Sequence, residues 1–453
     1  MGRLLSVFSG KRLFLSFFLF LSSCSTALKD QSQVSRLCLQ DNYVKAKAIL
    51  NDNSHLYGRK NTLLYFLDKG LILHLSGDYK ESIAAFDKAK RTFDELYTRS
   101  LSAMAGTWLV NEYSASYHGE DFERVMINIF QALNYLMVGD LDEALVEARQ
   151  VDSKLSVINS RYKPGEKNAY KEDAFARLFM GIIYEASNTP EDMNNAFISY
   201  RKALETYETD YRKNYDFSAP SLLKENLLAT ADYMGIEEAR EYRKKYHGIP
   251  FLSLKEKSQK AQVYLIQYEG VSPTKEEGSL VIPLPDGYLV KMAFPKYRRI
   301  PSKIKSSFFS ARDSSNGVIK AQVETGEDIS ALAMQNLESR KVRVMAKAIA
   351  VSSAKYLVER QQEEAIRKKF GAKAADSFKI ASSVFNAFST KADTRSWQTL
   401  PSEIRIARLC LNAGEYSFFV ENTDSEGGFL ESVTLGKIKV APGETKFFLI
   451  RSL

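Results

Sequence analysis

The chain has 453 residues, of which 45% are hydrophobic and 26% are charged, proportions that are ordinary for a globular protein. Its length is enough for two or three domains, and after the first two dozen residues no apolar run is long enough to predict a membrane span. The formal net charge of +8 fits an anionic neighbour such as a lipid surface or the cell wall. No CxxC pair is present, and we predict that Cys38 and Cys410 are buried free thiols.

The N-terminal residues predict export from the cytosol. Three basic residues precede an apolar run at 13–21, which is too short to cross the roughly 30 Å hydrocarbon core of a membrane. A basic segment, a short apolar segment and small residues at its end are typical of a secretory signal peptide. The pattern ends with Leu-Ser-Ser-Cys at 21–24, which resembles the bacterial lipobox.

The resemblance to a lipobox implies cleavage before Cys24 and acylation of that cysteine. Residues 1–23 would then be the signal peptide and residues 24–32 a lipidated linker. Several acyl chains would anchor the protein stably, because each buried methylene contributes about 0.8 kcal/mol. Ser25 stands where lipoproteins of the inner membrane often carry aspartate, which favours the outer membrane with the protein facing the periplasm. The alternative is an ordinary signal peptide with an incidental cysteine.

Residues 33–247 contain an internal repeat. The segment FLDKGLILHLSGDYKESIAAFDKA at 66–89 resembles a tetratricopeptide repeat (TPR), with a small residue in the first helix, a Gly-Asp-Tyr turn and an apolar face on the second helix. A second copy covers 132–148, a third begins at Gly181, and weaker copies lie before and after these. The predicted packing positions are Gly70, Gly77, Tyr79, Phe86, Ala89, Ala132, Gly139, Ala144, Gly181, Tyr184, Ala196, Tyr200 and Ala203.

Four or five such helical hairpins predict a solenoid, because a single hairpin cannot bury its apolar face alone. The concave face of a solenoid forms a groove, and we predict that it binds a protein partner. The alternative is that the helices only hold the C-terminal half of the chain and that the groove takes no partner.

Residues 250–453 predict a β-rich, sandwich-like domain. Alternating apolar residues at 262–270 and 280–295 indicate strands, a Ser-Asn-Gly turn at 315–317 indicates a hairpin, and 403–451 contain four more strand-like runs. The predicted fold class is therefore α+β, with a TPR-like solenoid followed by this domain.

A helical pair at about 328–390 interrupts the β-rich region. Asp328 is the predicted cap of a long helix that ends at Phe370, and Gly371 is its predicted stop. The second helix is expected at 374–389. We interpret this pair as an insertion in the β domain; the alternative is that it links two halves of that domain.

A wider resemblance covers most of the chain. The segment HGEDFERVMINIFQALNYLMVGDLDEALVEA at 118–148 and the segment KADTRSWQTLPSEIRIARL at 391–409 together are similar to an uncharacterised family of bacterial TPR-containing lipoproteins. The resemblance implies a lipid anchor and a helical repeat domain, but no activity.

Two polar clusters are candidate sites. Asp393, Arg395 and Trp397 would bind a glycan or a peptide if they were exposed; the alternative is that they cap a helix and join the two domains. The acidic residues near His118, at 120–123, could hold a metal or form an acid/base pair. Their spacing is not that of an HExxH site, and acids in the first turn of a helix are also favoured by the helix dipole.

Basic residues in the C-terminal half suggest peptidoglycan or anionic lipid as further partners, although a solvated face is the alternative. They are Lys291, Lys296, Arg298, Arg299, Lys303, Lys305, Arg312 and nine lysines or arginines within 340–369. We expect no nucleic-acid partner, no cofactor and no metal, and the catalytic motifs GxSxG and the Walker loop are absent.

The function predicted from the sequence is a periplasmic lipoprotein that acts as a TPR interaction scaffold in cell-envelope assembly. The alternatives are a cell-wall or glycan-binding lipoprotein that uses the basic C-terminal half and, less favoured, a wall-processing enzyme. The prediction on balance is that the protein is not an enzyme.

Overall fold

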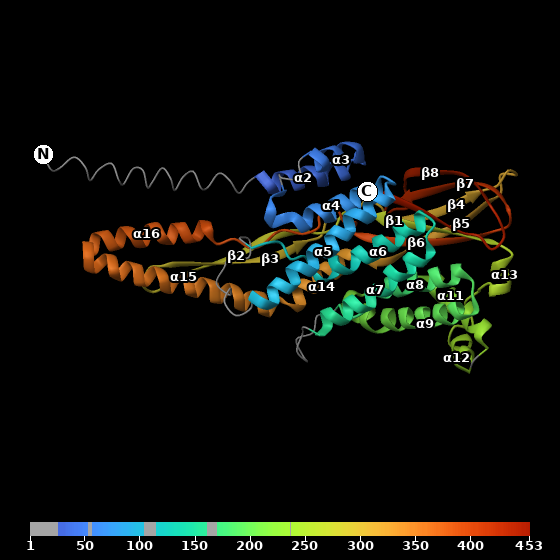
Figure 1. Ribbon diagram of the computed structural model, residues 1–453, viewed down its shortest axis with the longest axis horizontal. Coiled ribbons are helices and arrows are strands. Elements are labelled where there is room, and N and C mark those ends of the chain that lie inside the picture. Colours follow the sequence, from blue (N-terminus) through green and yellow to red (C-terminus); the bar gives the residue numbers. More distant parts are fainter. Residues whose placement is uncertain (1–25, 53–56, 104–114, 161–169, 236) are drawn as a thin grey trace.

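The computed structural model describes residues 26–52, 57–103, 115–160, 170–235 and 237–453. An array of paired helices lies against a curled sheet, and a long helical hairpin projects from the opposite end of the molecule (Figure 1). The predicted signal peptide and Cys24 lie outside the described residues.

The N-terminal part is an array of antiparallel helix pairs, as the repeats predict. Successive pairs pack side by side through α5 against α6, α7 against α8 and α9 against α11. The pairs are α2 (Thr26–Cys38) with α3 (Tyr43–Asp52), α4 (Thr62–Leu75) with α5 (Tyr79–Ala103), α6 (Asp121–Met137) with α7 (Leu141–Ser160), α8 (Ala174–Ser187) with α9 (Pro190–Thr206), and α11 (Ser221–Met234) with α12 (Glu237–Lys245). The short turns η2 (Arg59–Asn61), η4 (Tyr207–Tyr211) and α10 (Arg212–Tyr215) complete it.

Two glycines lie at the closest contacts within these pairs. A Cβ atom added at Gly70 would lie 2.5 Å from the ring of Phe86, and one added at Gly181 would lie 2.4 Å from the ring of Tyr200. Each first helix can therefore approach its second helix only because the side chain is absent.

The predicted linker at 24–32 is helical from Thr26 onward. Helix α2 is held by the C-terminal half, since the buried Gln31 side chain donates a hydrogen bond to the carbonyl of Ser396 at 2.9 Å. This partner lies 365 residues away along the chain, so the local sequence does not predict the contact.

The β-rich half forms one seven-stranded sheet in the order β8-β7-β4-β5-β6-β1-β9. All neighbours are antiparallel except β1 and β9, which are parallel. The strands are β1 (Ala261–Glu269), β4 (Ser306–Arg312), β5 (Val318–Asp328), β6 (Glu403–Leu411), β7 (Gly414–Thr423), β8 (Phe429–Val440) and β9 (Thr445–Ser452), and the short helix α13 (Leu254–Ser258) precedes them.

This sheet curls until it is nearly closed, which corrects the prediction of a sandwich. The ring of Phe448 on β9 lies 5.1 Å from that of Phe418 on β7 and 6.2 Å from that of Phe309 on β4. Strands from opposite ends of one sheet thus share an apolar interior. A sandwich would need two separate sheets, but β5 pairs with both β4 and β6, and β1 pairs with both β6 and β9, so all seven strands form one sheet.

Strand β1 is buried along all nine residues because both of its faces are covered. Successive side chains of a strand point to opposite faces. Tyr264, Ile266 and Tyr268 belong to the core shared with the helical array, whereas Val263 and Leu265 belong to the core inside the curled sheet.

The predicted helical pair consists of three helices, α14 (Ile329–Ser339), α15 (Lys341–Phe370) and α16 (Ala372–Ser389). Asp328 caps α14, where its side chain accepts the Ala331 N–H at 2.8 Å, and Gly371 ends α15 with a φ of 88°. The break between α14 and α15 was not predicted. It falls at Arg340, whose side chain pairs with Glu120 at the start of α6.

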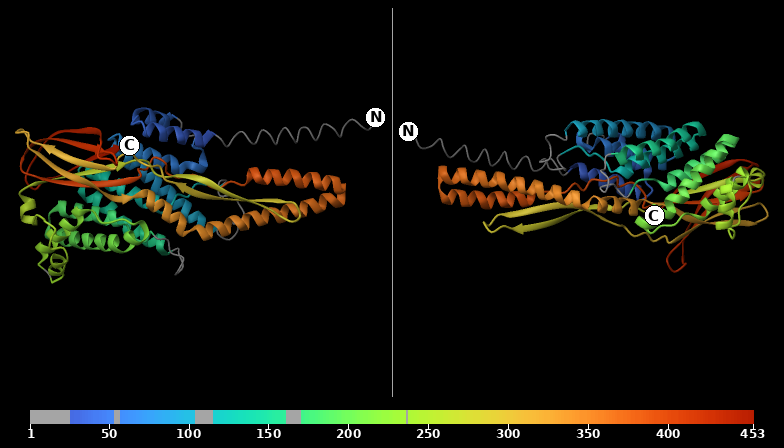
Figure 2. Two further views of the ribbon diagram at one scale, coloured as in Figure 1. Left: turned by 180° about the vertical axis from the view of Figure 1, so that it is seen from behind. Right: turned by 90° about the horizontal axis from the view of Figure 1, so that it is seen from below.

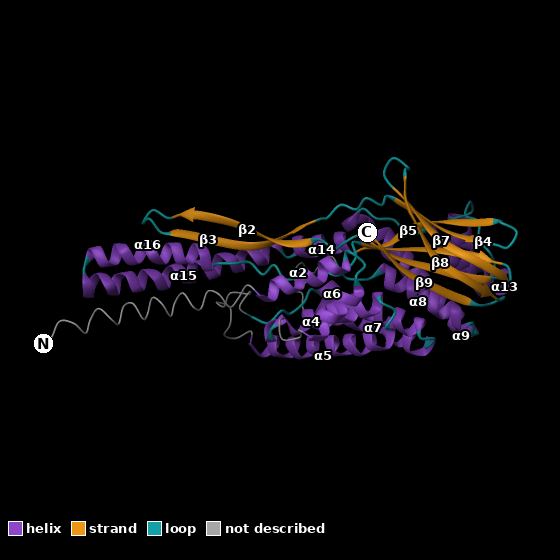
Figure 3. Cartoon of the chain, turned by 90° about the horizontal axis from the view of Figure 1, so that it is seen from above, coloured by secondary structure: helices purple, strands orange, loops and turns teal. Residues whose placement is uncertain are grey.

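Helices α15 and α16 project together from the rest of the molecule, and a two-stranded sheet lies along them (Figure 3). This second sheet is the hairpin of β2 (Thr274–Pro283) and β3 (Leu289–Arg298). We call α15, α16 and the β2–β3 hairpin the arm.

Candidate functional site

The predicted partner groove is filled by the chain itself. The helical array lies along one face of the curled sheet (Figure 2), and a segment at 391–402, which we call the clasp, crosses between them. Trp397 of the clasp is 1% exposed, and its ring lies 5.9 Å from those of Phe86 and Phe130. The alternative given for the array, that it holds the C-terminal half, describes this arrangement.

The first helices of four successive pairs supply the contacts to the sheet. From α4, His74 Nε2 lies 2.7 Å from the Tyr268 hydroxyl on β1, and from α11, Glu225 pairs with Arg408 on β6 at 2.5 Å. Helices α6 and α8 contribute Phe130 and Phe179 to the same core. First helices line the concave face of a repeat array, so the face expected to bind a partner binds the sheet.

Two buried carboxylates hold the clasp. Glu123 accepts the backbone N–H of Trp397 at 2.8 Å, and Asp68 accepts the Thr399 hydroxyl at 2.8 Å. That hydroxyl in turn accepts the indole N–H of Trp397 at 2.9 Å. Burial raises the pKa of Asp68 to about 7, and burial together with the charge of Glu120 raises the pKa of Glu123 to about 7.

The trio Asp393, Arg395 and Trp397 is not an exposed binding surface. The Arg395 guanidinium is 3% exposed and donates to both Asp393 carboxylate oxygens, at 2.8 and 2.7 Å. Its remaining nitrogen donates to the Asn61 side chain at 3.0 Å and to the carbonyl of Ala115 at 3.1 Å. These contacts join the clasp to the helical array, which is the joining role in the structural alternative given for this trio.

The acidic residues at 120–123 begin helix α6 and anchor neighbouring elements. Glu120 and Glu123 form a capping box, in which Glu123 accepts the Glu120 N–H at 2.9 Å. Glu120 also pairs with Lys275 of β2, at 2.5 Å, and with Arg340. Although burial alone would raise it, these two cations lower the pKa of Glu120 to about 2.

A second buried junction lies between the array and the start of the sheet. Lys257 of α13 donates to Glu185 of α8 at 2.7 Å and to Asn226 of α11 at 2.9 Å, and both ionised side chains of the pair are at most 3% exposed. The Tyr211 hydroxyl donates to the buried Glu327 at the end of β5 at 2.8 Å. No motif marks these residues in the sequence, because each partner is distant along the chain.

These polar groups position the two halves, and the described residues contain no group of three His, Cys, Asp or Glu side chains that could hold a metal ion. Within the same ranges no helix is long and apolar enough to cross a membrane. Cys38 and Cys410 are free thiols; Cys38 is buried as predicted, whereas Cys410 is partly exposed.

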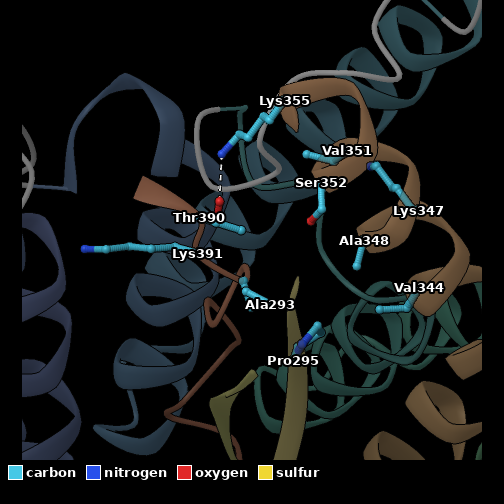
Figure 4. Close-up of a pocket in the computed structure, with 11 residues that line it drawn as sticks. Ala293, Pro295, Val344, Lys347, Ala348, Val351, Ser352, Lys355, Thr390 and Lys391 are labelled. Atoms are coloured by element: carbon cyan, nitrogen blue, oxygen red, sulfur yellow. Dashed lines mark hydrogen bonds between the residues drawn. The ribbon is translucent and has the colours of Figure 1, made fainter. Parts of the chain in front are cut away.

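Shallow cavities lie at the base of the arm. One of about 50 Å³ is bordered by β3, α15 and the start of the clasp (Figure 4), and there Lys355 donates to the Thr390 hydroxyl at 2.8 Å. Another of about 240 Å³ lies between β3 and the α14–α15 junction, against the apolar side chains of Met334 and Leu337. Both volumes are below the roughly 300–1,000 Å³ of pockets that enclose a drug-sized ligand.

The arm has polar side chains among its buried residues and many apolar side chains on its exterior. The buried residues of the 30-residue helix α15 are Ser352, Glu359 and Glu363. Tyr288 donates to Glu363 at 3.0 Å, and Ser352 donates to the carbonyl of Lys291 at 2.9 Å. Twelve of the 23 exposed large apolar side chains in the described ranges lie on the arm: Leu280, Val281, Ile282, Leu289, Val342, Ile349, Leu357, Val358, Phe370, Ile380, Val384 and Phe385.

The predicted basic surface is largely neutralised along the β2–β3 hairpin. Lys291 pairs with Glu277 at 2.8 Å, and Arg298 pairs with Glu276 at 2.5 Å. Arg299 pairs with Asp328 at 2.9 Å. These three basic residues therefore have acidic partners, and the wall polymer and anionic lipid stay predicted partners.

No family model matches the sequence, and no curated protein matches it either. Among solved structures, a putative kinesin light chain of Podosopora anserina with nearly identical TPR-like repeats, and a variant of that protein with one substitution, match with a TM-score of 0.30 and 11% identity. The match covers 49% of this chain and 93% and 92% of those chains. A likeness this weak carries no functional information, so the TPR-like character of the array rests on its own helix packing.

Proposed function

We propose that the protein is a lipid-anchored scaffold of the cell envelope whose interaction surface is the arm. In this proposal the TPR-like array is a platform for the chain's own C-terminal half. The observation that supports it is that the groove is filled by the clasp and β1, whereas the arm exposes twelve large apolar side chains. Exposed apolar surface that gathers on one part of a protein marks an interaction site.

The anchor part of the proposal depends on Cys24 and on the resemblance of residues 21–24 to a lipobox. We expect the wild-type protein, expressed in a bacterium and fed labelled palmitate, to carry the label and to sediment with membranes. Cys24→Ala should remove the label and leave an unprocessed chain. Cys410→Ser, at a partly exposed thiol, is the matched control and should stay labelled. Label that persists in Cys24→Ala would contradict the anchor.

The scaffold part can be tested with a photo-crosslinking amino acid. Leu357 on the arm and Val44 on the array are both well exposed, at 60% and 77%, so neither replacement should disturb the fold. We expect a specific crosslinked species from position 357 and none from position 44. Adducts from position 44 alone would show that the array, and not the arm, is the docking surface.

A further inference from the structure

The tip of the arm combines an exposed aromatic side chain with exposed lysines. Helix α15 ends with Arg-Lys-Lys-Phe, Gly371 turns the chain, and α16 begins with Ala372 and Lys373. Residues 367–373 are all exposed, and the Phe370 side chain is 66% exposed. The turn lies at the end of the molecule opposite the curled sheet (Figure 1).

The acidic side chains Glu363 and Asp376 at the tip form ion pairs, whereas three lysines there do not. Arg367 binds Glu363 at 2.8 Å and Asp376 at 3.1 Å. No ion pair to Lys368, Lys369 or Lys373 occurs within the described residues; the ammonium of Lys369 lies 5.3 Å from the centre of the Phe370 ring. The tip therefore presents uncompensated positive charge around an apolar ring.

We propose that this tip docks on a surface of anionic lipid headgroups. Lysines are attracted to such a surface, and an apolar phenylalanine ring is favoured at the boundary between headgroups and acyl chains, so the two kinds of side chain at the tip complement the two layers of the interface. The inference goes beyond the proposed scaffold function and does not require acylation of Cys24.

An exposed phenylalanine on the curled sheet provides an internal comparison. Phe429, at the β7–β8 hairpin, is 67% exposed, almost the same as Phe370. Its neighbours in the sequence are acidic, namely Asp424, Glu426 and Glu431. A membrane that selects by charge as well as by apolar surface should accept Phe370 and reject Phe429.

The test replaces each ring with a fluorescent one in the full chain. Phe370→Trp and Phe429→Trp are mixed separately with vesicles that carry brominated acyl chains and contain either phosphatidylcholine alone or about one-third phosphatidylglycerol. The native Trp108 and Trp397 are common to both variants and cancel in the comparison. We expect bromine quenching at position 370 in the anionic vesicles, and little at position 429.

Charge is tested by adding Lys368→Gln and Lys373→Gln to Phe370→Trp. Because each basic group contributes to attraction by an anionic surface, we expect the quenching at position 370 to need on the order of tenfold more lipid. Equal quenching at both positions, equal quenching in neutral vesicles, or none at position 370 would overturn the proposal. The two tryptophan variants are also compared in a Cys24→Ala background, in which the proposed lipid anchor cannot form. A difference in quenching between positions 370 and 429 that persists there depends on the tip and not on the anchor.

Discussion

Single residues decide how closely the helices of the array pack. Gly70 and Gly181 occupy equivalent places in two repeats, and each lies under an aromatic ring of its partner helix. Sequence spacing identified both positions because the repeat places them at a constant distance from a Gly or Asn turn. Sequence spacing did not identify Glu123 as the acceptor of the Trp397 backbone N–H, because the two residues lie 274 positions apart.

We predict that Gly70→Ala lowers the free energy of unfolding by about 1–3 kcal/mol, because the Phe86 ring must move to admit the methyl group. Chemical denaturation of the two proteins measures the difference. Gly248→Ala is the control, since an added Cβ there meets no atom within 4 Å, and its effect should stay within about 1 kcal/mol. An equal loss in both variants would show that packing against Phe86 is not the cause.

The buried Asp68 should make stability depend on pH. Its pKa rises from 3.8 to about 7 on folding, so its contribution is fully present below about pH 4 and is lost as the pH rises through about 7. The pKa of His74 falls to about 4, so this histidine makes stability rise with pH over part of the same range. Because His74 is present in both the wild type and Asp68→Asn, its contribution cancels when the two proteins are compared. We expect the stability of the wild type relative to Asp68→Asn to fall by about 1–3 kcal/mol between pH 4.5 and pH 7.5, measured by denaturation. A constant difference across that range would contradict the assignment.

At the scale of helices and strands, the Glu120 carboxylate joins three parts of the fold: α6, β2 and the α14–α15 junction. Glu120 begins α6 and pairs with Lys275 of β2 and with Arg340 between α14 and α15. The ends of the helices near Asp328 and Gly371 could be predicted, because a cap and a C-terminal glycine are local signals. The break at Arg340 could not, because it depends on this distant acid.

We expect Glu120→Gln to destabilise the fold by about 3 kcal/mol, because it leaves the buried Lys275 without its counter-charge. Glu338→Gln is the matched control. Its partner is Lys341, both side chains are about 60% exposed, and its loss should cost less than about 1 kcal/mol. Thermal or chemical unfolding compares the two, and similar small losses would show that water reaches the Glu120 pair.

For the whole molecule, the array and the sheet form one folding unit. A single core includes residues of α4, α6 and α8 together with Tyr268, Trp397 and Ile404 of the C-terminal half. The domain boundary predicted near 247–250 therefore separates two kinds of secondary structure, but the larger core crosses it, and only the core inside the curled sheet belongs to one side.

We predict that residues 26–247 produced alone lose the cooperative unfolding of the intact chain and bind a hydrophobic dye. The reason is that the faces of α4 and α6 that pack on Tyr268 and Trp397 would be exposed to water. Circular dichroism melts and dye fluorescence measure this, with the full chain as the reference. A fragment that melts as sharply and at the same temperature, without dye binding, would contradict the shared core.

Periodicity and turn residues were enough to predict the helix pairs, most strands and the hairpin whose turn contains Asn316, because each depends on residues close together in the chain. Only the tertiary structure shows which strands become neighbours, that β1 pairs in parallel with β9, and that the clasp fills the groove. Thr399, for example, meets Asp68 across 331 residues. Contacts of that kind depend on the fit between two whole surfaces. The local pattern that predicts a groove is the same whether the groove binds a partner or the chain's own C-terminal half.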